Sequence, residues 1–268
     1  AHVGVLMALE EEGVPVDMLG GTSMGSFVGG VYAKEPTALL TRIIARRLAV
    51  HMSSAWEQLL DLTVPVVSYF SGFRMNRALE PLFRGAKIED CWLPFFCLTL
   101  DLISCAPIVH RNGTLWRYVR ASMALVGFLP PVCDRPATEA TQRRARSRSR
   151  TLASSSSASS STSQMHVLVD GGYVNNLPTD VMRSMGARVV IAVDVSGRGL
   201  PETRMRPWGD AISGFGLFLR NVAPSWLGGG PTCPTMAQMQ SHLPFVTDYA
   251  NAARRVGTVD IMVRPAVA

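Results

Sequence analysis

The chain has 268 residues, 47% of them hydrophobic, which is enough for one large α/β domain or two small ones with a sizeable core. Residues 136–166 hold five arginines and one glutamate, a net +4 of the total formal charge of +6; the remaining +2 gives no reason to expect a polyanionic partner. The five cysteines form no C-x-x-C pair, which argues against a disulfide scaffold or a zinc site and favours a reducing compartment.

The first 35 residues predict a strand between two helices. Residues 2–12 place an apolar stripe on one helical face, and Gly13 ends that helix. The following "VPVDMLGG" is typical of a short buried strand. From Met24 to Tyr32 the apolar residues again recur at helical spacing. Residues 14–35 therefore form a strand, a tight turn and a helix, with Ser23 at the turn.

The middle of the chain predicts helices followed by strands. Residues 37–90 have a mostly helical pattern, and "PFFCLTLDLIS" (94–104) indicates a strand. A membrane-spanning helix is not expected in this apolar region, because a span needs ~18–20 uninterrupted apolar residues and three residues interrupt it: Pro94, Asp101 and Pro107. The Asn-Gly pair in "RNGT" (111–114) indicates a hairpin turn, and a helix is expected over 115–127.

The second half contains an insertion and then returns to strands and helices. Residues 136–165 are rich in Arg and Ser, cannot bury a core, and are expected to be a disordered insertion. After them, "HVLVDGG" predicts a strand and turn, "NNLPTDVMRSMGA" a helix, and "RVVIAVDVSG" a buried strand of the parallel kind. This alternation indicates an α/β fold. Two aspartates on apolar strands are interpreted as residues that cap or pair: Asp101 and Asp194.

The turn "LGGTSMGSFVGG" (19–30) fits two kinds of site. A phosphate-binding Walker loop requires G-x-x-x-x-G-K-[ST]; Gly20 and Gly25 have the glycine spacing, but Ser26 stands where the lysine must be. A nucleophile elbow requires G-x-S-x-G, which is present with Ser23 at its centre. The strand–turn–helix context favours the elbow, although a glycine-rich turn that only lets a helix pack closely has the same residues.

A serine nucleophile needs an adjacent base, and the sequence offers two candidates. Of the five histidines, only His242 fits the chain order of an α/β-hydrolase, and it is interpreted as a surface or packing residue of a helix. Asp170 follows a strand, and Gly171 and Gly172 let the backbone turn and bring its carboxylate toward another element. An Asp-Gly turn without a catalytic role has the same pattern, so both interpretations of Asp170 stay open at this point.

The combination of G-T-S-M-G around Ser23 with D-G-G at Asp170 is far more specific than either motif alone, and it resembles the patatin-like phospholipases. The closer resemblance is to the neuropathy target esterase branch of lysophospholipases. Three stretches carry it: "AHVGVLMALEEEGVPVDMLGGTSMGSFVGGVYA", "GTLWRYVRASMALVGFLPPVCD" and "LVDGGYVNNLPTDVMRSMGARVVIAVDVSG". The resemblance covers most of the chain except 136–165 and becomes thin after about residue 200.

The resemblance implies a patatin-like α/β fold with three α/β/α layers and a central, mostly parallel sheet. It carries Ser23 over as the nucleophile and Asp170 as the general base, without a catalytic histidine, cofactor or metal. The implied reaction is hydrolysis of fatty-acyl esters of phospholipids or lysophospholipids through an acyl-enzyme, with lysophosphatidylcholine-type lipids as the expected substrate. The alternatives are a phospholipase A, a neutral-lipid hydrolase and, in a different class, a catalytically inactive lipid-binding domain.

The resemblance also implies a glycine-rich loop, G-G-G-x-[RK]-G, just before the helix at His2, with N–H groups that build the oxyanion hole. Since the chain begins at Ala1, we expect residues 1–268 to be a single catalytic domain without its first strand and this loop.

The expected partners are the lipid substrate and a membrane surface, contacted peripherally or through regions outside this chain. The expected location is the cytosolic face of an intracellular membrane such as the endoplasmic reticulum, and no nucleic acid is expected.

Deleting residues 137–163 is expected to leave folding intact, because a segment of this composition buries no apolar core. Thermal unfolding of the shortened chain should give the same midpoint as that of the full chain. A large loss of thermal stability would contradict the interpretation of these residues as an insertion.

Overall fold

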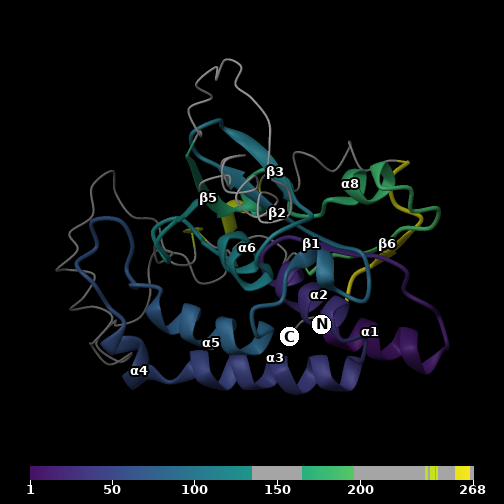
Figure 1. Ribbon diagram of the computed structural model, residues 1–268, viewed down its shortest axis with the longest axis horizontal. Helices are drawn as coiled ribbons and strands as arrows, with labels where there is room; N and C mark the ends of the chain where they lie inside the picture. Colours follow the sequence, from purple (N-terminus) through teal and green to yellow (C-terminus); the bar gives the residue numbers. More distant parts are fainter. Residues whose placement is uncertain (135–164, 196–238, 241, 245, 247–256, 266–268) are drawn as a thin grey trace, which may run out of the picture.

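The computed structural model describes residues 1–134, 165–195, 239–240, 242–244, 246 and 257–265 (Figure 1). The predicted insertion at 136–165 lies outside these residues except for Met165. The first strand, turn and helix expected from the sequence are present: two residues separate β1 (Leu19–Gly21) from α2 (Met24–Lys34). Ser23 lies between them, so the local order predicted for residues 14–35 is confirmed.

A five-stranded sheet is organised around β2 (Phe95–Asp101), which contacts three other strands. β1 runs parallel to it, with Leu19 opposite Phe95. The other strands of this sheet are antiparallel to their neighbours: β3 (Ala106–His110) and β5 (His166–Asp170) pair with β2, and β4 (Val132–Asp134) pairs with β5. A separate parallel pair is formed by β6 (Ile191–Val193) and β7 (Ile261–Val263).

The predicted α/β class is confirmed, and both strand orientations occur in the described sheets. Two pairings are parallel, β1 with β2 and β6 with β7, and the other three are antiparallel. The connection from β2 to β3 covers only residues 102–105. That is too short for the crossover of a dozen or more residues that a parallel neighbour requires, so β3 has to return antiparallel.

Helices cover the sheet and extend away from it. α2 and α6 (Leu115–Ser122) contact β2 and each other. α3 (Ala38–Ser53) runs along the lower edge of the molecule in Figure 1 and contacts α1, α2 and α5. The remaining bounds are α1 (His2–Glu11), α4 (Ala55–Leu60), α5 (Phe73–Phe83), α8 (Thr179–Ser184) and the 3-10 turns η1 (Ile88–Asp90) and η2 (Gly171–Tyr173). None of the helices formed by the described residues is long and apolar enough to cross a membrane.

The hydrophobic core lies between β2 and the helices. Phe27 of α2 meets Phe83 of α5 edge to face, with ring centroids 6.3 Å apart, and both side chains are almost fully buried. Phe95 and Cys97 of β2 belong to this cluster. The alternate residues Phe96 and Leu98 are equally buried. β2 is therefore covered on both faces, which makes it a rigid platform for the elements attached to it.

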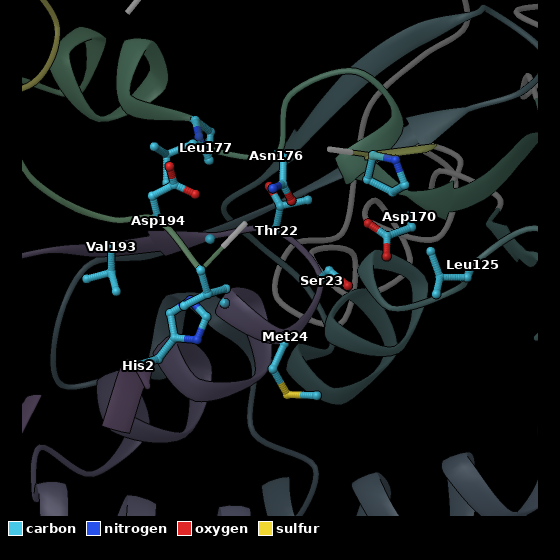
Figure 2. A pocket seen from close by; sticks show the side chains of 15 residues that line it. His2, Thr22, Ser23, Met24, Leu125, Asp170, Asn176, Leu177, Val193 and Asp194 are labelled. Carbon is cyan, nitrogen blue, oxygen red and sulfur yellow. The ribbon is translucent and has the colours of Figure 1, made fainter. Parts of the chain in front are cut away.

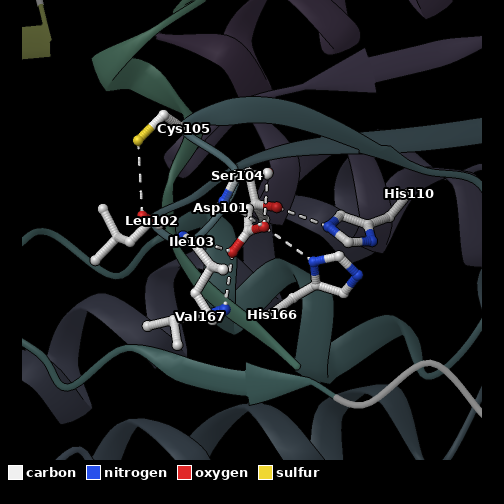
Figure 3. A network of polar contacts seen from close by, with 9 residues as sticks. Asp101, Leu102, Ile103, Ser104, Cys105, His110, His166 and Val167 are labelled. Carbon is white, nitrogen blue, oxygen red and sulfur yellow. Dashed lines mark hydrogen bonds and ion pairs between the residues drawn. The ribbon is translucent and has the colours of Figure 1, made fainter. Parts of the chain in front are cut away.

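The end of β2 is fixed to β5 by the buried carboxylate of Asp101 (Figure 3). It accepts hydrogen bonds from the backbone N–H groups of Ile103 (3.2 Å), Ser104 (3.2 Å) and Val167 (2.9 Å), and His166 Nδ1 lies 2.9 Å away. Burial alone raises the pKa of Asp101, but these hydrogen bonds outweigh it and hold the pKa well below its usual value. Asp101 thus caps a turn and pairs with a histidine, as the sequence interpretation expected.

Candidate active site

The turn between β1 and α2 holds Ser23 in an unfavourable backbone conformation. Its φ is +53° and its ψ is −125°, a combination that residues with a side chain rarely adopt. Conformations of this kind cost ~1–3 kcal/mol and persist only where the surrounding structure enforces them. Ser23 is partly exposed and lies between the buried Thr22 and the exposed Met24. This is the backbone geometry expected of a serine held up by a sharp strand-to-helix turn.

Two glycines make this turn possible. A Cβ atom at Gly20 would lie 2.1 Å from the Phe96 ring, and one at Gly21 would lie 2.5 Å from the backbone of Gly25. Both distances are far below van der Waals contact, so only glycine fits at either position. The first glycine of the G-x-S-x-G pattern is therefore required by the approach of the helix to the strand.

Ser122, the last residue of α6, holds the turn in place through a hydrogen bond to Ser23. The Ser23 N–H donates to Ser122 Oγ (2.9 Å), and the Ser122 hydroxyl in turn donates to the carbonyl of Leu98 (2.7 Å). Ser26 Oγ donates to the Ser23 carbonyl (2.6 Å). Both backbone polar groups of Ser23 are thus engaged, and the turn is tied through Ser122 to the central strand β2.

Asp170 is placed beside this turn by the end of β5. Its backbone N–H donates to the carbonyl of Ala124 (3.0 Å), and its Oδ1 accepts the N–H of Gly172 (2.8 Å). A Cβ atom at Gly171 would lie 2.4 Å from the carbonyl oxygen of Leu98, so only glycine allows this close approach of η2 to β2. Asp170 itself is fully buried, and its Oδ2 has no hydrogen-bond partner among the described residues.

The hydroxyl of Ser23 and the carboxylate of Asp170 point toward each other across one end of a cavity (Figure 2). Burial raises the pKa of Asp170 to about 6, while the hydrogen bond from Gly172 and the interaction with Ser23 lower it. A carboxyl group with this pKa is mostly ionised at pH 7 and is a better proton acceptor than an ordinary aspartate. The pair can therefore transfer a proton from serine to carboxylate.

The cavity has a volume of about 260 Å³ and walls that are largely apolar. Besides Ser23 and Asp170, its lining includes His2, Leu125, Leu177, Pro178, Val193 and Pro244. A larger cavity of about 580 Å³ lies between α1, β1 and β6. It shares His2, Gly25 and Val193 with the first cavity, but neither Ser23 nor Asp170 lines it. In the described part of the chain, no three His, Cys, Asp or Glu side chains gather in a way that would hold a metal ion.

Comparison with known proteins identifies the family. The sequence profile described as "Patatin-like phospholipase" matches residues 1–183. The chain belongs to this family. It is 44% identical over 247 residues to the patatin-like phospholipase domain-containing protein 6 of Mus musculus, and that match covers 92% of this chain and 16% of the relative.

Two further relatives of the patatin-like chain are similar over the same region. The patatin-like phospholipase domain-containing protein 7 of Mus musculus is 43% identical over 246 residues, with 92% of this chain and 16% of the relative covered. The protein "Lysophospholipase nte1" of Aspergillus fumigatus is 37% identical over 254 residues, with 95% of this chain and 14% of the relative covered. The chain thus spans only about one sixth of the length of these relatives.

The structure brings together the two residues singled out from the sequence, Ser23 and Asp170, and separates others. His242 does not line the cavity, which agrees with its interpretation as a packing or surface residue. His2 does line it, although its position in the chain gave no reason to consider it, and burial lowers its pKa. Asp194 lines the cavity as well and pairs with Arg264, with Oδ2 and Nε 3.2 Å apart. Sequence reasoning also missed Ser122, which is a small polar residue inside the helix predicted for 115–127 and the last residue of the observed α6.

Replacing Ser122 by alanine is expected to destabilise the protein by about 1–3 kcal/mol, because it leaves the Ser23 N–H and the Leu98 carbonyl without their buried partner. Chemical denaturation measures this change. Ser184→Ala is the matched control. Like Ser122, Ser184 is the last residue of a helix and its hydroxyl donates to a backbone carbonyl, but Ser184 is exposed and its acceptor lies in its own helix. Its replacement should change the free energy of unfolding by no more than about 0.5 kcal/mol. Equal midpoints for the two variants would contradict the supporting role of Ser122.

Proposed function

We propose that this patatin-like chain is a serine acyl hydrolase in which Ser23 is the nucleophile and Asp170 the general base. The observation that carries the proposal is the pairing of a strained, partly exposed serine with a buried carboxylate that keeps one oxygen without a hydrogen-bond partner among the described residues. Serine is a weak nucleophile until a neighbouring base accepts its proton. Asp170 is the carboxylate that faces it, and its raised pKa suits that task.

The reaction proceeds in two steps. As Ser23 Oγ attacks the acyl carbonyl, Asp170 accepts the hydroxyl proton and then passes it to the departing alcohol oxygen, which leaves an ester between the acyl group and Ser23. A water molecule then gives its proton to Asp170 and attacks this ester; the fatty acid leaves, and the proton returns to Ser23 Oγ. The negative charge that develops on the carbonyl oxygen lies beside the start of α2, where the N–H of Met24 has no intrahelical partner.

The proposed substrates are fatty-acyl esters of phospholipids or lysophospholipids, with lysophosphatidylcholine-type lipids first. The apolar lining of the cavity suits an acyl chain next to the ester. The names of the two relatives, a patatin-like phospholipase domain-containing protein and a lysophospholipase, support the same class of substrate. A phospholipase A and a neutral-lipid hydrolase are the enzymatic alternatives, and a catalytically inactive lipid-binding domain is the alternative of another class.

The proposed place of action is a membrane surface on the cytosolic side of the cell, such as that of the endoplasmic reticulum. Lipid substrates reside in membranes, so the protein has to reach them there. The four cysteines in the described part of the chain are free thiols, which supports a reducing compartment: Cys91, Cys97, Cys105 and Cys133.

A fluorophosphonate probe should label Ser23, because such probes react with activated serine hydroxyls. Ser23→Ala should abolish labelling, and Asp170→Asn should slow it by about 10²–10⁴-fold, the usual contribution of a positioned base. Mass spectrometry of the labelled peptide measures the site. Asp90→Asn is the control, since Asp90 is exposed and does not line the cavity. If Ser23 stays unlabelled both in this chain and in a longer one that carries the glycine-rich loop implied by the family resemblance, the inactive lipid-binding alternative is favoured.

The labelling rate is expected to rise with pH through about 6 and to level off above it, because only the ionised Asp170 accepts the Ser23 proton. Below pH 6 the rate should fall about tenfold per pH unit as the carboxyl group becomes protonated. The measurement is the rate of probe labelling between pH 4.5 and about 8. A half-maximal rate near pH 4, the value of an ordinary aspartate, would contradict a buried base.

A further inference from the structure

Residues 59–73 run from the end of α4 to the start of α5 (Figure 1). We call them the apolar loop, because an unusual number of their apolar side chains are exposed. Val64, Val66 and Val67 are 76%, 84% and 62% exposed. Four more large apolar residues of the loop are exposed: Leu59, Leu60, Leu62 and Phe73. No other stretch of this length among the described residues exposes as many. Contiguous apolar surface of this kind marks an interaction site rather than ordinary surface.

The apolar loop is folded, and its exposure does not come from a frayed end. The Thr63 N–H donates to the Tyr69 carbonyl (2.9 Å), and the Ser71 N–H donates to the Asp61 carbonyl (2.9 Å). Leu62 and Phe70 form an antiparallel bridge between these two contacts. The two arms of the loop are therefore held together, and the tip at residues 64–67 projects its valines into solvent.

The charge pattern of the loop suits a lipid interface. Asp61 is the one acidic or basic residue in residues 59–73, and it is buried and hydrogen-bonded by the Ser71 hydroxyl. The projecting tip therefore carries no charge that insertion among acyl chains would have to desolvate. Arg74 and Arg77 follow immediately in α5. Basic residues beside an apolar anchor favour a membrane that contains anionic lipid.

The loop is continuous with the wall of the candidate active site. The Tyr69 N–H donates to the Gly127 carbonyl (2.8 Å), and the Phe70 N–H donates to the Phe128 carbonyl (3.1 Å). The Phe70 and Phe128 rings are in contact, with centroids 6.0 Å apart. Leu125, three residues earlier in the same segment, lines the cavity that contains Ser23. A surface on which the loop rests would thus lie beside the segment that forms the cavity wall.

We propose that the apolar loop inserts into the lipid surface and holds the cavity of Ser23 at that surface. The choice of a lipid partner rests on the proposed lipid hydrolase function, while the loop's exposure, lack of exposed charge and attachment to the cavity wall stand independently. Burying the valines at the tip among acyl chains removes apolar area from water, which supplies the binding free energy. The exposed Arg77 of α5 is then available to the lipid headgroups, whereas the half-buried Arg74 donates to the carbonyl of His51.

The test measures co-sedimentation of the chain with phosphatidylcholine vesicles, with and without phosphatidylserine. The double variant Val66→Asp/Val67→Asp should reduce the vesicle partition coefficient at least about tenfold, because it replaces inserting side chains with charges. Val189→Asp is the matched control, since Val189 is 66% exposed but precedes β6, outside the loop; it should bind like the unchanged chain. Thermal unfolding verifies that all variants are folded.

Three results would overturn the inference: no vesicle binding by the unchanged chain, equal binding by the loop variant, or equal losses in the loop and control variants. Size-exclusion chromatography tests whether the loop instead binds a second copy of the chain. A dimer that depends on the loop, without vesicle binding, would show this. Ser23→Ala should bind vesicles normally. Absence of hydrolysis together with loop-dependent vesicle binding would therefore refute the proposed function alone, whereas hydrolysis with loop-independent binding would refute this inference alone.

Discussion

The backbone conformation of Ser23 is the constraint around which the rest of the site is arranged. A positive φ at a residue with a side chain is unfavourable, so neighbouring elements have to enforce it. Gly20 and Gly21 remove the side chains that would block the turn, and Ser122 fixes the Ser23 N–H. The free energy that this conformation costs is offset by packing elsewhere, chiefly by the core between α2, α5 and β2.

Strand β2 connects the two halves of the site, which are about 150 residues apart in the sequence. The carbonyl of Leu98 accepts a hydrogen bond from the Ser122 hydroxyl, which itself accepts the N–H of Ser23. The same carbonyl is the group that Gly171 approaches most closely. The register places Thr99 opposite Asp170. Because β2 is buried on both faces, these attachments are rigid, and the distance between serine and carboxylate is set by packing rather than by loop flexibility.

The features that the sequence could predict are those encoded by neighbouring residues. The turn at Ser23 and the bend after Asp170 both depend on adjacent glycines, so their patterns are visible in a few letters. Ser122 and His2 could not be predicted in this way, because their proximity to the turn arises from the packing of α6 and α1. The antiparallel course of β5 could not be predicted from residues 166–170 either, because strand direction depends on the path of the whole chain.

The unpartnered oxygen of Asp170 fits the role of general base that we propose for this residue. A second hydrogen bond to Oδ2 from elsewhere in the protein would satisfy a buried acceptor, but it would also lower the pKa of Asp170 and occupy the position that the Ser23 proton takes in the proposed reaction. Buried unpaired polar atoms are rare in folded proteins and call for a reason. In the proposed reaction the strained serine beside the carboxylate supplies that reason, since both unfavourable features serve one proton transfer.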